Sequence, residues 1–493
     1  MAGLKSLARD TAVYGLSSIV GRFLNWGLVP LYTITFSQAE YGVVTLVYAV
    51  VAVALLVLTY GMETGFFRFA NHERWSDPME VYSTALISLA VSSSVFVAVI
   101  FCILVPVSRW LECAAHPEFV GMMAVCVALD AFTALPFSYL RYRSKALRFA
   151  ILRLIGIGVN IGLNLFFILL CPWLMRVAPG SVDWFYNPDF GIGYIFLSNL
   201  VASALTLVLL IPELCGFPRR FNGRLWREMI VYSAPLLVLG VAGVMNQTID
   251  KIIFPSLVHD HADAMAQLGI YGANYKIAII MVMFIQAFRF AYEPFIFSRS
   301  RDKGENHIQA FSDAMKYFVL FAILIFLGVM YYLDIIRYFI SPRYFSGLRV
   351  VPVVMLAEFF FGVFFNLSLW YKLTDRTIWG AWFSLFGLGV TVALNVLLVP
   401  RIGYMGCAYA ALCSYGAMMV ASYFVGRHYY PIPYHLRRIA AYCVAAAALY
   451  FVGIYALAPL PRLAAYALRA LLLAGYVAAI VRFEKIPIPG LRR

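Results

Sequence analysis

The chain has 493 residues, of which 63% are hydrophobic and only 13% are charged, and its mean hydropathy is +0.84. A water-soluble protein cannot bury so large an apolar fraction, so the composition excludes a soluble protein and predicts a polytopic membrane protein. The formal net charge of +14 could suggest nucleic acid binding. No soluble basic region exists to bind it, so we expect no nucleic-acid partner and attribute the charge to membrane topology.

Long apolar runs follow one another along the whole chain. A membrane-spanning helix needs roughly 20 apolar residues, because a rise of about 1.5 Å per residue must cross about 30 Å of hydrocarbon. About fourteen runs meet this requirement. They lie near residues 11–35, 41–61, 82–106, 119–140, 149–171, 191–212, 229–254, 268–292, 311–332, 350–370, 377–399, 404–425, 438–457 and 463–482. The predicted fold is therefore all-α.

The basic residues between these runs indicate the orientation. With the N-terminus in the cytoplasm, the cytoplasmic side holds roughly three times the Lys and Arg residues of the opposite side. On the outer side we place Arg109, Arg176, Lys251, Arg337, Arg343, Arg349, Arg401 and Arg462. We therefore predict that both termini are cytoplasmic.

Motifs of catalysis are missing from the sequence. It contains no phosphate-binding loop of the G-x-x-x-x-G-K-[ST] type, no H-E-x-x-H and no G-x-S-x-G. The eight cysteines form no C-x-x-C pair and have no neighbouring histidine cluster, so we interpret them as packing residues. We expect no catalytic residue, no metal and no cofactor, and thus a protein that is not an enzyme.

Two pairs of segments suggest an internal repeat. The stretch "VYGLSSIVGRFLNWGLVPLY" from residue 13, followed by "AEYGVV", parallels "VYSAPLLVLGVAGVMNQTID" from residue 231, followed by "GIYGAN". A second pair is "NLFFILL" with "FGIGYIFLSNLVAS" and "NVLLVPRIGYMGCAYAALCS". The spacing predicts two six-helix bundles, residues 1–215 and 216–430, and two additional helices with a cytoplasmic tail in residues 431–493. An even number of helices per repeat preserves orientation, so the bundles would be related by a pseudo-two-fold axis along the membrane normal.

These same stretches, "GLSSIVGRFLNWGLVPLYTITFSQAEYGVVTL", "APLLVLGVAGVMNQTIDKIIF", "LGIYGANYKI" and "NVLLVPRIGYMGCAYA", resemble the Wzx-type oligosaccharide flippases of the polysaccharide transporter family. That family belongs to the multidrug/oligosaccharidyl-lipid/polysaccharide exporter superfamily. The resemblance implies two six-helix bundles around a central cavity lined by the first, second, seventh and eighth helices. It also implies alternating access, a cargo of undecaprenyl pyrophosphate-linked oligosaccharide, membrane lipids as surroundings, a place in the bacterial inner membrane, and contact with a glycan polymerase or ligase.

Polar residues recur at helical spacing in three of the predicted spans. Charged residues near the bilayer centre cost at least about 2.5–3.5 kcal/mol each, so they usually face the protein interior and serve function. On the first and eighth spans the candidates for a cationic, substrate-binding cavity are Arg22, Asn25, Lys276, Gln286 and Arg289. Arginine suits a pyrophosphate, because its planar fork gives two parallel hydrogen bonds to phosphate oxygens.

Other polar residues have two interpretations that the sequence leaves open. The gate or structural residues on the seventh and eighth spans are Asn246, Gln247, Asp250, Lys251 and Glu293. The four residues of the seventh span either line the outer half of the cavity, or form an interfacial pair and interhelical hydrogen bonds. Glu293, near the cytoplasmic end of the eighth span, either belongs to the polar face of that span or forms an i,i+4 salt bridge with Arg289.

Two acids inside other spans, Asp130 and Glu358, could couple transport to an ion gradient, because a desolvated carboxylate takes up a proton more readily. The alternative for both is a capped or paired acid at a bundle interface.

Three functions remain at this point. The first is a flippase for a lipid-linked oligosaccharide, serving O-antigen, capsule or exopolysaccharide synthesis. The second is an ion-coupled drug or cation exporter of the related extruder group, which we expect to present acidic rather than basic residues to its cargo. The third is a membrane glycan polymerase or glycosyltransferase, which usually needs a sizeable external loop that we do not find here.

Overall fold

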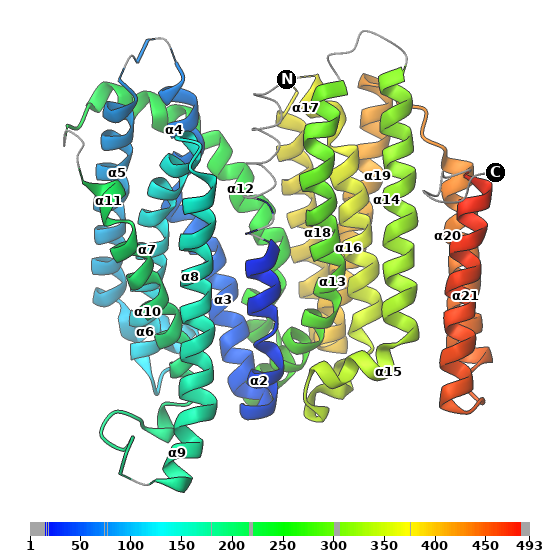
Figure 1. Ribbon diagram of the computed structural model, residues 1–493, viewed down its shortest axis with the longest axis horizontal. Coiled ribbons are helices and arrows are strands. Elements are labelled where there is room, and N and C mark those ends of the chain that lie inside the picture. Colours follow the sequence, from blue (N-terminus) through cyan, green and yellow to red (C-terminus); the bar gives the residue numbers. More distant parts are fainter. Residues whose placement is uncertain are drawn as a thin grey trace. The chain divides into compact units, whose positions relative to one another are not determined.

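The structure is a computed structural model that describes residues 15, 17, 19–72, 74–75, 77–178, 180–215, 220–299, 306–374 and 376–484. For residues 261–262, 291, 293–299 and 306–307 it describes the backbone alone. Within these ranges the chain forms helices and turns and no β-strand (Figure 1). The predicted all-α class is confirmed.

Twelve segments of the described chain are long and apolar enough to cross a membrane. The helices that form them are α3 (Gln38–Thr59) with α4 (Met62–Ala70), α5 (Pro78–Cys102), α7 (Pro117–Tyr142), α8 (Ala146–Leu165) with η1 (Phe166–Leu170) and α9 (Cys171–Val177), α12 (Gly223–Leu257), α13 (His261–Arg299), α14 (Asn306–Tyr331), α16 (Val350–Leu367) with α17 (Leu369–Leu373), α18 (Ile378–Ile402), α19 (Tyr404–Tyr429), α20 (Leu436–Phe451) with η5 (Val452–Ala456), and α21 (Arg462–Phe483). The protein is therefore a multi-pass membrane protein.

The two remaining predicted spans correspond to shorter helices. The run at 191–212 contains α10 (Gly193–Leu209). The run at 11–35 contains a helical stretch at 19–26 and then α2 (Val29–Thr35). Short connecting helices complete the list: α6 (Leu104–Trp110), η2 (Pro188–Phe190), α11 (Ile211–Leu214), α15 (Leu333–Ile336), η3 (Arg337–Phe339) and η4 (Pro342–Gly347).

The chain divides into two compact units. Unit 1 comprises Met1–Lys276 and Ile378–Ser414, and unit 2 comprises Ile277–Thr377 and Tyr415–Arg493. The division passes through α13 and α19. The bundle boundaries predicted from the repeat, at residues 215 and 430, stay a prediction, because a sequence repeat and a packing unit need not share their ends.

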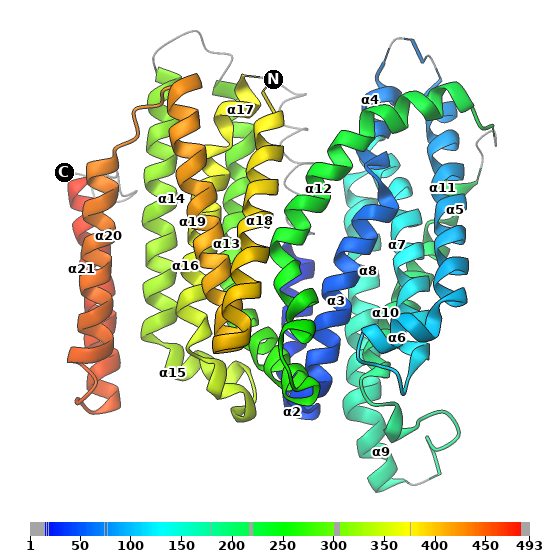
Figure 2. The same cartoon turned by 180° about the vertical axis from the view of Figure 1, so that it is seen from behind.

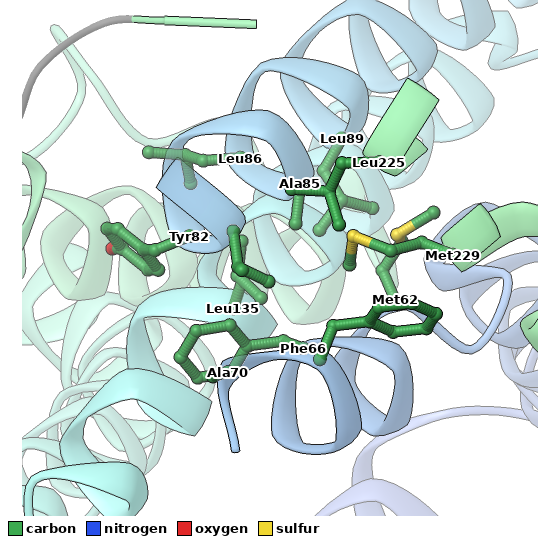
Figure 3. Packing of buried hydrophobic residues seen from close by; sticks show 12 residues of the cluster. Met62, Phe66, Ala70, Tyr82, Ala85, Leu86, Leu89, Leu135, Leu225 and Met229 are labelled. Carbon is green, nitrogen blue, oxygen red and sulfur yellow. The ribbon is translucent and has the colours of Figure 1, made fainter. Parts of the chain in front are cut away.

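A buried cluster within unit 1 joins four helices. Figure 3 shows Met62 and Phe66 of α4 packed against side chains of α5, α7 and α12, among them Leu135 and Met229. These four side chains are 0% exposed. The cluster fixes the end of α12 that begins at Gly223 against the α4–α5 connection.

Local sequence explains how α3 and α12 begin and bend. Ser37 and Glu40 form a capping box at the start of α3, where each side chain bonds to the other residue's backbone N–H. The Asn222 side chain caps α12. Pro235 lies inside α12, where its ring removes a backbone hydrogen bond and bends the helix (Figure 2). The bend lets one helix follow both α4 and α3.

The two Tyr-Gly pairs that suggested the repeat meet at one helix contact. A Cβ atom on Gly42 of α3 would lie 2.0 Å from the Met265 carbonyl oxygen of α13, and one on Gly272 would lie 2.4 Å from the Thr45 hydroxyl. A Cβ on Gly269 would lie 1.9 Å from the Gln38 carbonyl oxygen. Glycine is required at these positions because the two backbones approach closely, as small residues permit in membranes.

Within unit 2 the C-terminal pair α20–α21 packs against α14. The Tyr331 hydroxyl at the end of α14 donates to the Leu449 carbonyl oxygen of α20, 2.7 Å away. At the other end, Lys316 of α14 contacts Glu484 beyond α21 at 2.5 Å. Polar contacts thus fix both ends of the pair.

Candidate functional site

Unit 1 contains a cavity of about 460 Å³. Side chains from the 19–26 helix, α3, α4, α7, α8, α10 and α12 line it. Its polar lining consists of Asn25, Thr59, Glu63, Asp130, Thr133, Arg153, Asn160, Asn199, Ser203 and Thr206. Such a concentration of polar groups between membrane helices requires a water-filled or ligand-filled space.

Asp130 on α7 faces this cavity. One carboxylate oxygen accepts a hydrogen bond from the Ser203 hydroxyl of α10 at 2.7 Å, and the Cys126 thiol lies 4.0 Å from the other oxygen. The residue is exposed, because it borders the cavity. Among the described residues, no Lys or Arg nitrogen lies within 4.0 Å of this carboxylate. Asp130 is thus accessible to an ion or a cargo in the cavity, and its role in coupling stays a prediction.

Arg153 on α8 is the cation of the cavity. Its guanidinium lies 4.0 Å from the centre of the Phe137 ring, which stabilises the charge without consuming its hydrogen-bond donors. Within the part of the chain that the structure describes, no carboxylate oxygen lies within 4.0 Å of it. We did not predict Arg153 as a site residue. The pattern that could have found it is the spacing of Arg153, Asn160 and Asn164, which puts all three on one helix face.

Amide side chains extend the polar wall beyond Arg153. The Asn160 amide donates to the Asn25 side-chain oxygen at 3.5 Å, and the Asn164 amide donates to the Asn160 carbonyl oxygen. The Tyr32 hydroxyl of α2 donates to Asn164 at 2.9 Å. Asn25, which we predicted as a cavity residue, therefore lines a cavity and contacts α8, while its role in binding stays a prediction.

Glu63 of α4 borders the same cavity but is already paired. The Arg141 guanidinium contacts its carboxylate at 2.8 Å, and the Ser138 hydroxyl donates to it at 3.0 Å. Both partners come from α7. Glu63 is therefore neutralised by a neighbour, unlike Asp130.

A second polar group in unit 1 surrounds Asp250 of α12. Lys251 contacts both oxygens of its carboxylate, at 3.0 and 3.2 Å, and the Tyr271 hydroxyl of α13 donates to it at 2.7 Å. The Lys251 ammonium also lies 4.5 Å from the centre of the Tyr275 ring. Asp250 is buried. These contacts join α12 to α13 and engage both carboxylate oxygens.

The other two predicted residues of α12 point in different directions. Asn246 is buried and accepts a hydrogen bond from the Thr391 hydroxyl of α18 at 2.7 Å. Gln247 is exposed, and its backbone carbonyl oxygen accepts from Lys251. Asn246 and Asp250 therefore share a buried face, whereas Gln247 lies beside it.

The other residues predicted to line the cationic, substrate-binding cavity belong to both units. In unit 1, Arg22 is exposed on the 19–26 helix, and the Lys276 carbonyl oxygen accepts from the Trp26 indole at 2.7 Å. Gln286 is half-buried in unit 2. Arg289, also in unit 2, lies with its guanidinium 4.2 Å from the centre of the Phe365 ring. The continuous cationic path that we predicted stays a prediction.

The remaining predicted acids lie elsewhere. Glu358 is buried on α16 in unit 2. The Glu293 side chain lies outside the described residues. In the described part of the chain, no group of three or more His, Cys, Asp or Glu residues could hold a metal ion.

Comparison with known families identifies this architecture. A profile of the family described as "Polysaccharide biosynthesis protein" matches residues 7–300. The chain belongs to this family. The match includes every polar residue of the unit 1 cavity. The predicted family relationship is confirmed, and this member of the polysaccharide biosynthesis family is a multi-pass membrane protein. Comparison with curated protein sequences finds no match.

Solved structures share the fold of this polysaccharide biosynthesis protein. The lipid II flippase MurJ in an inward closed conformation has 13% sequence identity and a TM-score of 0.72, over 97% of this chain and 99% of that chain. An inward-facing multidrug resistance transporter of the MATE family has 12% identity and a TM-score of 0.67, over 88% and 98%. A MATE transporter in complex with MaD3S has 12% identity and a TM-score of 0.60, over 89% and 96%. At these identities the comparison shows the fold alone.

Proposed function

We propose that the protein is a flippase that moves a lipid-pyrophosphate-linked oligosaccharide across the bacterial inner membrane by alternating access, for the synthesis of a surface polysaccharide. Membership in the polysaccharide biosynthesis family and the fold shared with the lipid II flippase MurJ support a flippase. The observation that carries the proposal is the polar cavity of unit 1, which holds Arg153 and three asparagines.

The chemistry of this cavity suits a saccharide. A sugar hydroxyl donates and accepts hydrogen bonds, and an amide side chain offers both functions. Asn25, Asn160 and Asn199 present amides from three different helices, and Ser203 and Thr206 add hydroxyls. The volume of about 460 Å³ lies in the range of small-molecule sites, roughly 300–1,000 Å³. We therefore place part of the glycan in this cavity.

The charge balance of the cavity favours a polar cargo over a cation. Glu63 is neutralised by Arg141, so Asp130 and Arg153 remain as one negative and one positive charge. A site that selects cationic drugs is expected to present an excess of acids, because unlike charges attract strongly at low dielectric. The balance supports a flippase over the drug or cation exporter.

The pyrophosphate of the cargo needs cations of its own. We propose that Arg22, Lys276 and Arg289, with Gln286 as a hydrogen-bond partner, contact it in turn as access alternates. The residues around Asp250 act as a structural lock or gate in this scheme, and Asp130 or Glu358 couples the cycle to an ion gradient. A glycan polymerase or ligase would take up the delivered unit on the outer side.

Genetic replacement tests the proposal. Deletion of the gene should remove the surface glycan and trap undecaprenyl-linked units on the cytoplasmic side. Wild-type protein should restore the glycan, whereas Arg153→Ala and Asn160→Ala should restore it at least tenfold less efficiently, because each removes hydrogen bonds to cargo. Arg227→Ala is the matched control, because Arg227 is exposed and lies outside the cavity.

Two results would contradict the proposal. An unchanged glycan together with new drug sensitivity after deletion would favour the exporter. If Arg153→Ala is fully active at normal protein levels, the unit 1 cavity does not bind the cargo. The double variant Arg22→Ala with Arg289→Ala tests the cationic path separately, since intact flipping in this variant would contradict the path alone.

A further inference from the structure

The polar side chains of the unit 1 cavity differ in what they can still offer to a ligand. A hydroxyl carries one hydrogen and a carboxamide nitrogen carries two, so a hydrogen already donated within the protein is lost to a ligand. Following each hydrogen to its acceptor divides the cavity into two walls. We call them the acceptor wall and the donor wall.

The acceptor wall is formed by α3, α4, α7 and α10. Its hydroxyls donate their hydrogens to neighbouring oxygens: Thr59 to the Leu56 carbonyl, Thr133 to the Asp130 carbonyl, Ser203 to the Asp130 carboxylate and Thr206 to the Ala202 carbonyl. Glu63 and Asp130 add carboxylates, which accept only. This wall therefore offers lone pairs to a ligand.

Asn199 of α10 belongs to the acceptor wall although it is an amide. Its nitrogen donates to the Ile195 carbonyl oxygen at 2.9 Å and also to the Tyr48 hydroxyl of α3. A backbone carbonyl can only accept, so this bond fixes which end of the amide is the nitrogen. Both amide hydrogens are engaged, and the side-chain oxygen remains for a ligand.

The donor wall is formed by α8 and the 19–26 helix, and it holds the hydrogens that remain. Among the residues that the structure describes, none accepts a hydrogen bond from the Arg153 guanidinium or from the Asn25 amide nitrogen. Asn160 donates to the Asn25 side-chain oxygen at 3.5 Å and keeps its second amide hydrogen. The free donors of the cavity are thus gathered on one wall.

A chain of hydrogen bonds sets the direction of these amides. The Tyr32 hydroxyl donates to the Asn164 side-chain oxygen at 2.9 Å, and the Asn164 nitrogen donates to the Asn160 side-chain oxygen at 3.1 Å. Asn160 donates in turn to Asn25. Each amide accepts through its oxygen, so the chain ends at the Asn25 nitrogen with two unused hydrogens.

We propose that this cavity binds an N-acylated sugar of the glycan, with the acyl carbonyl oxygen at the donor wall and the sugar hydroxyls at the acceptor wall. This inference rests on the function proposed above. A carbonyl oxygen accepts only, whereas a hydroxyl can donate, so such a sugar is complementary to both walls. Ile157 lines the cavity beside Arg153 and Asn160 and offers an apolar surface to the acyl methyl group.

The charges of the cavity favour a neutral acceptor over a carboxylate. Arg141 neutralises Glu63, and Asp130 and Arg153 contribute one negative and one positive charge. An N-acyl group leaves this balance unchanged. A carboxylate on the sugar would add an uncompensated negative charge, which is costly between membrane helices.

Three short-chain lipid diphosphate sugars test the proposal on the purified full-length protein in detergent. They carry N-acetylglucosamine, glucose or glucuronic acid and share the same lipid and diphosphate. The N-acetylglucosamine derivative should bind about tenfold more tightly than the glucose derivative, because its carbonyl oxygen accepts a charge-assisted hydrogen bond. Arg153→Ala should abolish this preference.

Asn25→Asp replaces a donor by an acceptor of nearly the same size. It should weaken binding of the N-acetylglucosamine derivative about tenfold. Binding of the glucose derivative should stay the same, since a hydroxyl can donate to the new carboxylate. Thr206→Val is the control from the acceptor wall, and it should lower both affinities without changing their ratio. Both derivatives are measured on the same variant, so partial misfolding cannot change that ratio.

Equal affinities of the wild-type protein for the N-acetylglucosamine and glucose derivatives would overturn this inference and leave the proposed flippase intact. An unchanged affinity ratio in Asn25→Asp or Arg153→Ala would also overturn it. If the glucuronic acid derivative binds most tightly, the substituent is an anion and the neutral acyl group is wrong. Failure of all three derivatives to bind would contradict the proposed flippase as well.

Discussion

Two aspartates of unit 1, Asp250 on α12 and Asp130 on α7, lie inside apolar helices but have opposite surroundings. The Asp250 carboxylate is buried and accepts hydrogen bonds from Lys251 and Tyr271. The Asp130 carboxylate borders a cavity and accepts from the Ser203 hydroxyl. Both residues interrupt apolar helices, and only the structure separates them.

The difference shows how a charged residue is accommodated in a membrane protein. A carboxylate in the hydrocarbon region needs either a partner of opposite charge or access to water. The first solution engages the oxygens and fixes two helices together, as at Asp250. The second leaves the oxygens accessible to a ligand, as at Asp130. We therefore expect Asp250 to contribute stability and Asp130 to contribute transport.

Asp250→Ala is the strongest test of this distinction. It leaves the Lys251 ammonium without its carboxylate and the Tyr271 hydroxyl without its acceptor, both in a protein interior. We expect a loss of about 3–5 kcal/mol, because breaking a buried ion pair leaves an uncompensated charge. The measurement is the Tm and the folded yield of the purified protein. If Asp250→Ala folds normally but does not transport, Asp250 belongs to the transport site.

A double variant separates charge pairing from other effects. Asp250→Ala combined with Lys251→Met removes both charges and should recover a large part of the lost stability, because the cost of an unpaired charge disappears. No recovery would mean that the Tyr271 hydrogen bond, rather than the ion pair, accounts for the loss. Tyr271→Phe measures that contribution by itself.

Glu484 extends the comparison to a paired carboxylate outside the spanning segments. Burial raises its pKa, but hydrogen bonds from Lys316 and Tyr442 and the charges of Lys316 and Arg438 outweigh burial and hold the pKa below the ordinary value of 4.5. Glu484→Gln should cost about 1.5–3 kcal/mol at neutral pH. The contribution is complete above pH 4.5 and is lost as the pH falls through the lowered pKa, so the Tm difference from wild type should shrink there.

A surface pair supplies the control for Glu484. Glu228 contacts Arg74 at 3.2 Å, and both side chains are exposed. Glu228→Gln should change stability by at most about 1 kcal/mol, because solvent screens the pair. A Tm loss at Glu228→Gln as large as that at Glu484→Gln would contradict the role assigned to burial.

Thr391→Val tests a neutral contact on the same face as Asp250. It removes the hydroxyl that donates to the Asn246 side chain at 2.7 Å, within the buried contact of α12 and α18. The expected loss is about 1 kcal/mol, which is typical of one neutral hydrogen bond. Ser384→Ala on α18 is the matched control, because the Ser384 hydroxyl bonds within its own helix. An equal loss in both variants would mean that the interhelical bond contributes nothing specific.

The sequence was sufficient to predict the membrane helices and several local contacts. Apolar runs of the required length gave the spans, since the hydrocarbon thickness sets helix length. Asp250 and Lys251 are adjacent in sequence, so an ion pair between them was one of the two interpretations that the sequence offered. The Tyr-Gly pairs were visible as a pattern, and the structure explains Gly42 and Gly272 as a close contact of α3 and α13.

The contacts that show whether a polar residue has a structural or a functional role could not be predicted from local sequence patterns. Tyr271 and Thr391 reach α12 from other helices, and no local pattern connects Thr391 with Asn246, 145 residues away. Arg153 was missed because it lies near the start of an apolar run, where basic residues usually mark topology. Only the packing of α7 against α8 and α10 shows that Arg153 and Asp130 share a cavity.

Asp130→Asn should have the smallest effect on stability, within about 0.5 kcal/mol, because the amide oxygen can still accept from Ser203. The variant nevertheless removes the Asp130 carboxylate, which can bind a proton or a metal cation, from the cavity. We expect the rate of flipping by the wild-type protein in proteoliposomes to rise when a proton or sodium gradient is imposed. The rate of flipping by Asp130→Asn should not change with that gradient. Ser203→Ala keeps the carboxylate and should keep the response. If the gradient response survives in Asp130→Asn but disappears in Glu358→Gln, the coupling residue is Glu358 of unit 2. Asp130 would then be left with a role in binding cargo.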